Sequence, residues 1–465
     1  MSAVDTKQPA RRPTDGMLAL ARDIAEGRQR DAGTATKVPA SVYIDPEYWA
    51  REKAAIYDRL PQILCPSALL PEAGMAVPHD ATGRPLLITR DKDGVAHVFL
   101  NVCRHRGTRL VEGNDVQCTK KLVCPYHAWT YKTDGSLIGI PVKEGYDKTG
   151  FEKSSAKKGL QNIKNVHVYR DFVFVRLADE GLSFEEFFGE SLTSIDNMVD
   201  RSPEGRLEVV GNPLRYMNNC NWKMLVENQT DSFHPMIVHY SSAGTVKKIW
   251  EEMQPYEGPK PMVVECIVPF TMDYDFYKKM GIRVWQNGHG HTGVNFSIHS
   301  DYTDASGYFE KMVKSYGETR AKEILDENRH NTIYFPNIMV KGPIQTLRVF
   351  KPIAANRTLV ESWIFRLVGA PDMLLERTAM YNRLINAPTS IVGHDDTEVY
   401  ERAQEGLECN GNSWMNFQRD HFSPEGKSSE EIFDGSTEAQ MRNQFRAWKK
   451  FMGTTKSGPN RYDAN

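Results

Sequence analysis

The stretches Cys103-Arg-His105 and Cys124-Pro-Tyr-His127 decide the fold of the first half of this chain. Each stretch supplies one thiol and one imidazole, and residues 106–123 separate them. Two such loops can bind the two metal atoms of one cluster, with both thiolates on one iron and both imidazoles on the other. The pattern therefore indicates a redox protein.

Cys-x-His followed by Cys-x-x-His is the ligand pattern of a Rieske centre, a 2Fe–2S cluster whose imidazole ligands raise its reduction potential. The same four residues would also suit a tetrahedral structural zinc site, so zinc is the alternative. The flanking Arg106-Gly107 and Ala128-Trp-Thr-Tyr131 favour the cluster. Tight loops of this kind let backbone amides point at the cluster sulfurs.

The composition is that of an ordinary globular protein. Its 465 residues predict two to three domains, with 40% hydrophobic and 25% charged residues. Because 58 Lys and Arg nearly balance 60 Asp and Glu, we expect no nucleic-acid partner. The longest apolar runs are too short to span a bilayer, and residues 1–16 lack a signal-peptide core, so no membrane partner is expected.

The seven cysteines are dispersed, and an odd number does not indicate a disulfide framework. Cys103 and Cys124 are assigned to the cluster, and the other five are predicted to be small buried hydrophobic side chains. Cys118 has no partner at short spacing, so we expect it not to be a ligand. Free thiols favour a cytoplasmic location.

The chain divides into three predicted parts. Residues 1–59 form an N-terminal tail, disordered over 1–16, and helices that pack on the catalytic part. Residues 60–178 contain short strands and predict a small all-β Rieske domain with metal-binding loops at one end. Residues 179–465 form the catalytic mononuclear iron domain.

Local signals place elements within these parts. Asp93-Gly94 and Asp134-Gly135 predict β-hairpins. The remaining predictions are helices at 17–28, 45–60, 182–199, 305–328 and 371–405, and antiparallel strands within 259–276, 282–299, 331–350 and 358–368. A last helix at 436–452 carries Met441, Phe445, Trp448 and Met452 as one stripe, which predicts core or, alternatively, a subunit interface.

The second informative stretch is Asn221-Trp-Lys-Met-Leu-Val-Glu-Asn-Gln-Thr-Asp-Ser-Phe-His-Pro-Met-Ile-Val-His239. Glu227, Asp231 and His234 would share one face of a helix. His234 and His239 would point about 140° apart in a regular helix. They converge on one ion only if the helix ends or bulges between them, and Pro235 supplies a reason.

Two histidines and one carboxylate are the iron ligands of non-haem Fe(II) oxygenases. Two histidines alone would more often be ordinary hydrogen-bonded side chains. The upstream cluster motif favours iron, because a cluster that delivers one electron at a time needs an acceptor.

The two motifs in this order resemble the large (alpha) subunit of Rieske non-haem iron aromatic-ring-hydroxylating dioxygenases, over about residues 40–455. The resemblance implies an α+β fold, in which a small all-β Rieske domain precedes a helix-grip catalytic domain built on an antiparallel sheet. The implied cofactors are a Rieske 2Fe–2S cluster and a mononuclear Fe(II). Their implied ligands are Cys103, His105, Cys124 and His127 for the cluster, and His234, His239 and a downstream aspartate for the iron.

The resemblance places that aspartate in Val392-Gly-His-Asp-Asp-Thr397, eight residues before Gln404. This position is Asp396, with Asp395 as the alternative. His394 is expected to contact a ligand or simply to pack.

Asp231 and Asn228 are the implied catalytic residues. The resemblance gives Asp231 a bridging role, in which it accepts hydrogen bonds from His234 and from a cluster histidine of the neighbouring subunit in a trimer. A carboxylate between two imidazoles is a strong charge-assisted link. The alternative is a helix-surface aspartate. Asn228 matches a position near the open coordination site of the iron.

Other residues receive structural expectations. The resemblance gives Glu227 and Trp222 supporting or packing positions, and Asn221, Lys223 and Trp129 are expected to hold structure. Two departures are Ala128, where the family often has glycine, and a longer interval that predicts a surface loop at 114–121. His289 and His291 lie in a glycine-rich segment that predicts an exposed turn, with a metal pair as the alternative.

The implied function is that of an oxygenase component that uses O₂ for cis-dihydroxylation of an aromatic ring, as in aromatic hydrocarbon catabolism. Electrons would come from a ferredoxin or reductase, and from NAD(P)H only indirectly, because no Gly-x-Gly-x-x-Gly follows a strand. The alternatives are a Rieske monooxygenase or O- or N-demethylase, and a pure Rieske electron carrier. The implied assembly is a homotrimer, possibly with a small beta subunit, and a closed apolar pocket drawn from 218–245, 282–300 and 330–365 is expected over the iron.

Overall fold

The computed structural model describes residues 36–80, 83–113, 115–299, 305–420 and 431–453. The predicted disordered tail 1–16 and helix 17–28 therefore lie outside the described residues. The predicted helix at 45–60 is shorter, and consists of α3 (Pro46–Glu52) followed by a π-helical turn, Lys53–Tyr57. Asp45 caps α3 by accepting a hydrogen bond from the Glu47 amide at 2.8 Å. Before it lie β1 (Lys37–Pro39) and α2 (Ser41–Ile44).

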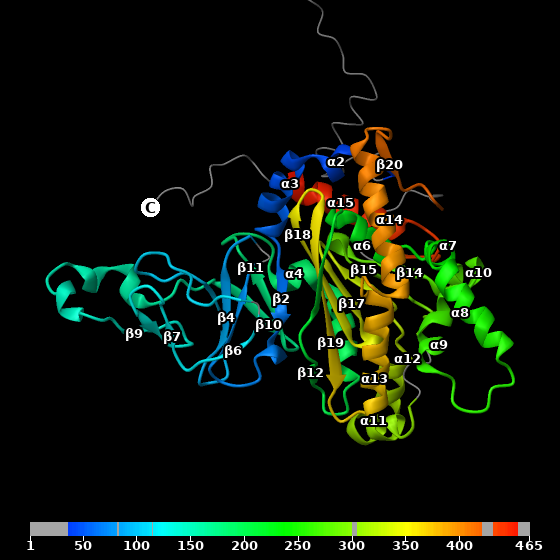
Figure 1. The fold of residues 1–465 in the computed structure, drawn as a ribbon, viewed down its shortest axis with the longest axis horizontal. Helices are drawn as coiled ribbons and strands as arrows, with labels where there is room; N and C mark the ends of the chain where they lie inside the picture. Colours follow the sequence, from blue (N-terminus) through cyan, green and yellow to red (C-terminus); the bar gives the residue numbers. More distant parts are fainter. Residues whose placement is uncertain (1–35, 81–82, 114, 300–304, 421–430, 454–465) are drawn as a thin grey trace, which may run out of the picture.

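Three small antiparallel sheets form residues 62–176, at one end of the molecule (Figure 1). The first contains β5 (Ala96–Leu100), β4 (Leu86–Arg90), β3 (Met75–His79) and β6 (Gln117–Cys118). The second contains β7 (Leu122–Val123), β8 (Thr130–Tyr131) and β9 (Leu137–Gly139). The third contains β10 (Asn165–Tyr169), β11 (Phe172–Arg176) and β2 (Gln62–Pro66).

The hairpin predictions are confirmed, since β4 pairs with β5 around Asp93-Gly94 and β8 pairs with β9 around Asp134-Gly135. The surface loop predicted at 114–121 is partly wrong, because β6 pairs with Met75 and Ala76 of β3. Short 3-10 turns follow β9, at Lys143–Tyr146, Phe151–Lys153 and Ser155–Lys158.

A nine-stranded antiparallel sheet is the framework of the C-terminal half (Figure 1). Its strands, in spatial order, are β12 (Leu207–Val209), β19 (Arg357–Leu367), β18 (Thr346–Ala354), β17 (Ile338–Lys341), β16 (Thr332–Tyr334), β15 (Gly290–Thr292), β14 (Ile282–Val284) and β21 (Glu431–Phe433), with β13 (Leu214–Asn218) also on β19. The α+β fold class predicted from the sequence is confirmed. A separate short strand, β20 (Trp414–Asn416), pairs with β1.

The helices of this half are α4 (Phe184–Phe188), α5 (Thr193–Asp200), α6 (Trp222–Thr230), α7 (Pro235–Val238), α8 (Tyr240–Glu252), α9 (Met262–Ile267), α10 (Tyr274–Met280), α11 (Tyr308–Tyr316), α12 (Glu318–Asp326), α13 (Asp372–Tyr381), α14 (Ile391–Glu408) and α15 (Ala439–Gly453). The helices predicted at 305–328 and 371–405 are present, whereas the helix predicted at 182–199 is interrupted at Gly189–Leu192. Among the described helices, none is long and apolar enough to cross a bilayer.

The strands predicted at 259–276 are wrong, because this segment is helical. Met262-Val-Val264 has the β-branched character of a strand, yet Pro261 precedes the first turn of α9. Asp273 caps α10 by accepting from the Phe276 amide at 2.9 Å. Here capping and burial outweigh local propensity.

The C-terminal helix α15 and the N-terminal segment pack on the same core as α6. The predicted stripe of α15 is buried in this core. The buried carboxylate of Glu52 accepts hydrogen bonds from Trp222 Nε1 at 2.9 Å, Lys223 Nζ at 2.6 Å and Trp448 Nε1 at 2.7 Å. These bonds fix the position of α6, the helix that leads to the second metal motif.

Candidate metal centres

Two loops of the same shape present the predicted cluster ligands. Cys103 follows β5, and its carbonyl oxygen accepts from the Gly107 amide at 3.0 Å. Cys124 follows β7, and its carbonyl oxygen accepts from the Ala128 amide at 3.0 Å. The last residue of each loop is left-handed, with φ of 76° at Gly107 and 54° at Ala128. This conformation explains why glycine suits position 128, and alanine adopts it at an energetic cost.

The side chains of these loops converge. The ring centroids of His105 and His127 lie 4.6 Å apart, and His105 stacks on Trp129 at 4.9 Å. The Nδ1 atoms of both histidines are buried without a hydrogen-bond partner. Cys103 and Cys124 are buried free thiols. Two orphaned imidazole nitrogens and two buried thiols fit a cluster held by two cysteines and two histidines.

Hydrogen bonds from the protein favour the thiolate forms. Burial raises the pKa of Cys103, and the Tyr131 hydroxyl, 3.3 Å from Cys103 Sγ, acts in the opposite direction. Burial acts to raise the pKa of Cys124 as well, but the amides of His127 and Tyr126 outweigh it and the pKa is lowered. Donors that point at ligand sulfurs are one of the ways in which proteins tune cluster potential.

The second motif is positioned by a helix break. Helix α6 starts at its Asn221 cap and ends at Thr230, before His234. The prediction that Glu227, Asp231 and His234 share one helical face is therefore wrong. Pro235 opens the new helix α7 at its first position, since a proline ring cannot donate the backbone bond that α6 would require there. His239 ends α7, so the two histidines flank this one short helix.

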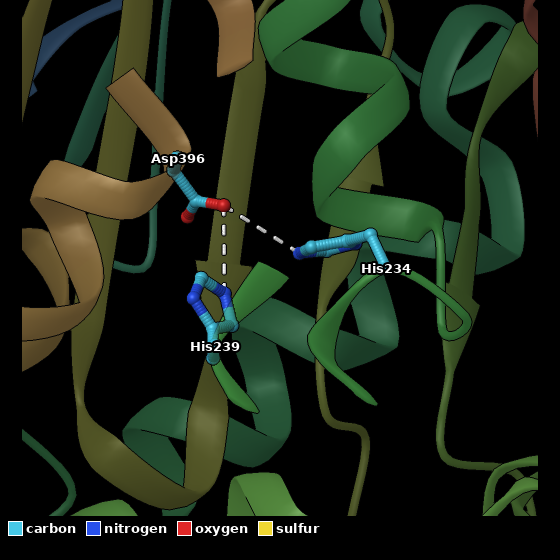
Figure 2. Close-up of side chains that lie close together, drawn as sticks. All are labelled: His234, His239 and Asp396. Carbon is cyan, nitrogen blue, oxygen red and sulfur yellow. Dashed lines mark ion pairs between the residues drawn. The ribbon is translucent and has the colours of Figure 1, made fainter. Parts of the chain in front are cut away.

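His234, His239 and Asp396 point toward one another from α7 and α14 (Figure 2). Asp396 Oδ1 lies 3.6 Å from His234 Nε2 and 3.5 Å from His239 Nε2. One donor atom from each residue lies within 4.8 Å of the others. Burial lowers the pKa of His234, although the Asp396 and Asp231 carboxylates act to raise it. Two imidazoles beside a carboxylate fit a two-histidine, one-carboxylate iron site.

Comparison with known proteins gives the family. Residues 61–157 match the Rieske [2Fe-2S] domain, and residues 206–452 match the ring hydroxylating alpha subunit (catalytic domain). The chain belongs to the ring-hydroxylating alpha subunit family. The Rieske match confirms the cluster interpretation over zinc. This family member is an oxidoreductase with a Rieske cluster and a mononuclear iron centre, as the sequence predicted.

Individual relatives are distant but similar in length. The anthranilate 1,2-dioxygenase large subunit of Acinetobacter baylyi is 29% identical over 423 residues, 88% of this chain and 81% of that protein. Toluate 1,2-dioxygenase subunit alpha of Pseudomonas putida is 27% identical over 82% of this chain and 81% of that protein. The structure of naphthalene 1,2-dioxygenase from Rhodococcus sp. bound to indole has the same fold, with a TM-score of 0.75 at 22% identity, over 96% of this chain and 100% of that chain.

Neighbouring side chains of this family member hold His234, His239 and Asp396 in place. Asp395 Oδ2 lies 3.3 Å from His239 Nδ1 and accepts from the Ser242 hydroxyl at 3.0 Å. Asn228 Nδ2 donates to Asp396 Oδ1 at 3.2 Å. Adjacent aspartates thus take different positions, with Asp396 beside the Nε2 atoms of both histidines and Asp395 behind His239. His394 is exposed, so the expectation that it contacts a ligand or packs is wrong.

The Asp231 carboxylate lies at the end of α6. It accepts from the Phe233 amide at 2.9 Å and from Arg419 Nη2 at 2.8 Å. A charge-assisted hydrogen bond from an arginine fixes the orientation of this carboxylate. The bonds to His234 and to a neighbouring subunit stay predictions. Arg419 was not expected from the sequence, because it lies far from any motif.

A cavity adjoins His234, His239 and Asp396. The expected segments 218–245, 282–300 and 330–365 each contribute to it. The wall formed by Phe270, Tyr277 and Met280, and the wall from Tyr381 to Val392, were not predicted. The expectation of an apolar pocket is only partly met, because buried Lys341 and Arg348 also line the cavity. The sequence signal for Lys341 and Arg348 was the presence of basic residues within otherwise apolar strands.

Several remaining residues differ from expectation. His289 and His291 are buried rather than in an exposed turn, and His289 Nε2 lies 2.8 Å from the Phe187 carbonyl oxygen. Strand pairing of β15 on both sides encloses His291, and His289, just before β15, packs against Phe187 and Phe188. Of the five cysteines predicted to be buried, Cys118 and Cys409 are exposed, while the others are buried.

Proposed function

We propose that this chain is the oxygenase component of a multicomponent dioxygenase that cis-dihydroxylates an aromatic ring. In the net reaction, an arene, O₂, two electrons and two protons give a cis-dihydrodiol. The convergence of His234, His239 and Asp396 beside a cavity, in the family-matched catalytic part, carries this proposal. A bound ferrous ion supplies O₂ activation there, with positions left open by three protein ligands.

The residues around this site position the ligands and exclude water. Asn228 holds the Asp396 carboxylate, and Asp395 orients the His239 ring. Aromatic and aliphatic side chains close one side of the cavity, which protects the reaction from wasteful proton leakage. Asp231 joins the iron ligand set to the Rieske ligand set of a neighbouring subunit in a homotrimer.

Partners follow from the chemistry of the two centres. The Rieske cluster receives electrons from a ferredoxin or reductase and ultimately from NAD(P)H. Relatives named as large or alpha subunits support a small beta subunit as an additional partner. Seven free cysteines support a cytoplasmic location.

The proposal also includes the domain boundaries. The Rieske domain covers residues 60–178 and the catalytic domain covers residues 179–465, after an N-terminal segment that ends at residue 59.

Metal analysis and isotope labelling test the function. Purified protein should contain about three irons per chain, two for the cluster and one for the catalytic site. A single turnover of reduced protein with ¹⁸O₂ should place both oxygen atoms in one diol product. Two irons per chain and no product would identify an electron carrier, and one labelled atom per product would identify a monooxygenase.

A further inference from the structure

The cavity beside the iron ligands has two unlike sides. Phe270, Met280, Ile298 and other side chains give it an apolar side, which suits an aromatic ring. Lys341 and Arg348 give it a cationic side. Burying a charged side chain costs free energy unless an acceptor or an opposite charge compensates it. A pocket for an uncharged hydrocarbon would not provide that compensation.

The sheet register places these two cations together. Lys341 pairs with Thr346 and Arg348 pairs with Met339, across β17 and β18. The two side chains are therefore diagonal neighbours on one face of the sheet, and both line the cavity. Lys341 is 4% exposed and Arg348 is 6% exposed. They form one buried patch of basic side chains, which we call the Lys341/Arg348 patch.

Neither cation has a carboxylate partner among the described residues. The Lys341 ammonium donates to the Tyr381 hydroxyl at 2.5 Å, which uses one of its three N–H groups. Arg348 donates to Gln229 Oε1 at 3.1 Å and to the Tyr216 hydroxyl at 2.7 Å, but its Nε is buried without a partner. The pair therefore keeps donors available for an acceptor from outside the chain.

The two carboxylates that line the cavity are already engaged. Asp396 lies among the iron ligand atoms, and Asp231 is held by Arg419. Burial and then the nearby Arg348 lower the pKa of Lys341, whereas the Asp396 carboxylate acts to raise it. An additional anion would raise it further. Lys341 also contributes to the lowered pKa of His330, another cavity residue.

We propose that the cavity takes an aromatic carboxylate, with its ring against the apolar side and its carboxylate on the Lys341/Arg348 patch. The hydroxylation of this ring rests on the proposed function, whereas the binding of the acid does not. The carboxylate would fix which ring edge faces the three ligand side chains, so the patch would also set regiochemistry. Charge-assisted hydrogen bonds of this kind are directional as well as strong.

Calorimetric titration of the iron-loaded holoenzyme tests the inference without turnover. The probes are benzoate and its neutral isostere benzamide. Wild-type protein should bind benzoate at least tenfold more tightly than benzamide, because only the carboxylate forms charge-assisted hydrogen bonds with the patch. Lys341→Met should remove most of this preference, and Lys341→Arg should retain it. Lys322→Met, on an exposed face of α12, is the matched control and should behave as wild type.

The outcomes separate this inference from the proposed function. Equal affinity of wild-type protein for benzoate and benzamide overturns the inference, even if neutral arenes are hydroxylated. Tight benzoate binding that depends on Lys341, without any hydroxylated product from fully iron-loaded and reduced protein, supports the inference and contradicts the proposed function. If Lys341→Met fails to fold, the wild-type comparison and Lys341→Arg decide.

Discussion

Arg419 Nη2 lies 2.8 Å from Asp231 Oδ1, although 188 positions separate the two residues in the sequence. The contact holds the Asp231 carboxylate at the end of α6, three positions before His234. The same guanidinium lies over the Phe233 ring at 4.9 Å. Arg419 therefore contacts two residues of the loop between α6 and α7. This arrangement gives the predicted bridging residue a defined orientation before any subunit docks.

Asp231→Asn should retain both metal centres and lower turnover on the order of 100-fold, because the amide nitrogen donates and so only one of the two terminal atoms can still accept from an imidazole. Iron content, the visible spectrum of the cluster and steady-state O₂ consumption measure the effect. Asp275→Asn, in the first turn of α10, is the control and should leave turnover unchanged. Normal turnover in Asp231→Asn would remove the bridging role.

Asp396→Ala should strip the mononuclear iron and leave the coloured cluster intact, because the variant loses the only carboxylate within reach of both imidazole Nε2 atoms among the described residues. Asp395→Ala removes only the partner of His239 Nδ1, so iron affinity should fall roughly 10–100-fold. Iron retention after dialysis against graded chelator measures both. A reversed order would assign the ligand to Asp395.

Tyr131→Phe should make the cluster potential more negative by some tens of millivolts. The hydroxyl 3.3 Å from Cys103 Sγ stabilises the reduced, more negative cluster, and its loss disfavours reduction. Redox titration followed by visible spectroscopy measures the shift. Tyr169→Phe, whose hydroxyl contacts Asp196 away from the cluster loops, is the control. An unchanged potential in Tyr131→Phe would exclude this tuning role.

Glu227→Gln should make stability less sensitive to pH. Burial raises the pKa of Glu227 to about 8 from its usual 4.5, while the Tyr43 hydroxyl, 2.7 Å away, acts to lower it. The folded protein therefore keeps a proton that the unfolded chain releases, and stability falls as pH rises from about 4.5 to about 8. One pKa unit corresponds to about 1.4 kcal/mol, so the difference reaches a few kcal/mol.

Melting temperatures at pH 5 and pH 8 test this expectation. The advantage of wild-type protein over Glu227→Gln should shrink, or reverse, at the higher pH. Glu376→Gln, on an exposed part of α13, should show no such change. Parallel pH profiles for wild type and Glu227→Gln would show that Glu227 is ionised in the folded protein.

Sequence predictions were more accurate where the structure depends on neighbouring residues than where it depends on distant ones. The hairpins at Asp93-Gly94 and Asp134-Gly135 were predictable because two adjacent residues set the turn. The strands predicted at 259–276 were wrong because capping and burial overrode β-branched propensity there. His289 and His291 were misjudged for a similar reason, since their burial comes from strand pairing with distant residues.

The sequence by itself determined the chemistry. Ligand types and their spacing along the chain are visible in the sequence. The sequence therefore predicted the Cys-x-His and Cys-x-x-His loops and the two histidines on either side of Pro235. Only the tertiary structure brought Asp396 to these histidines and Asp395 behind one of them, because adjacent residues on a helix point about 100° apart. It alone placed Lys341 and Arg348 in the cavity, because antiparallel register, not sequence distance, decides which side chains share a face.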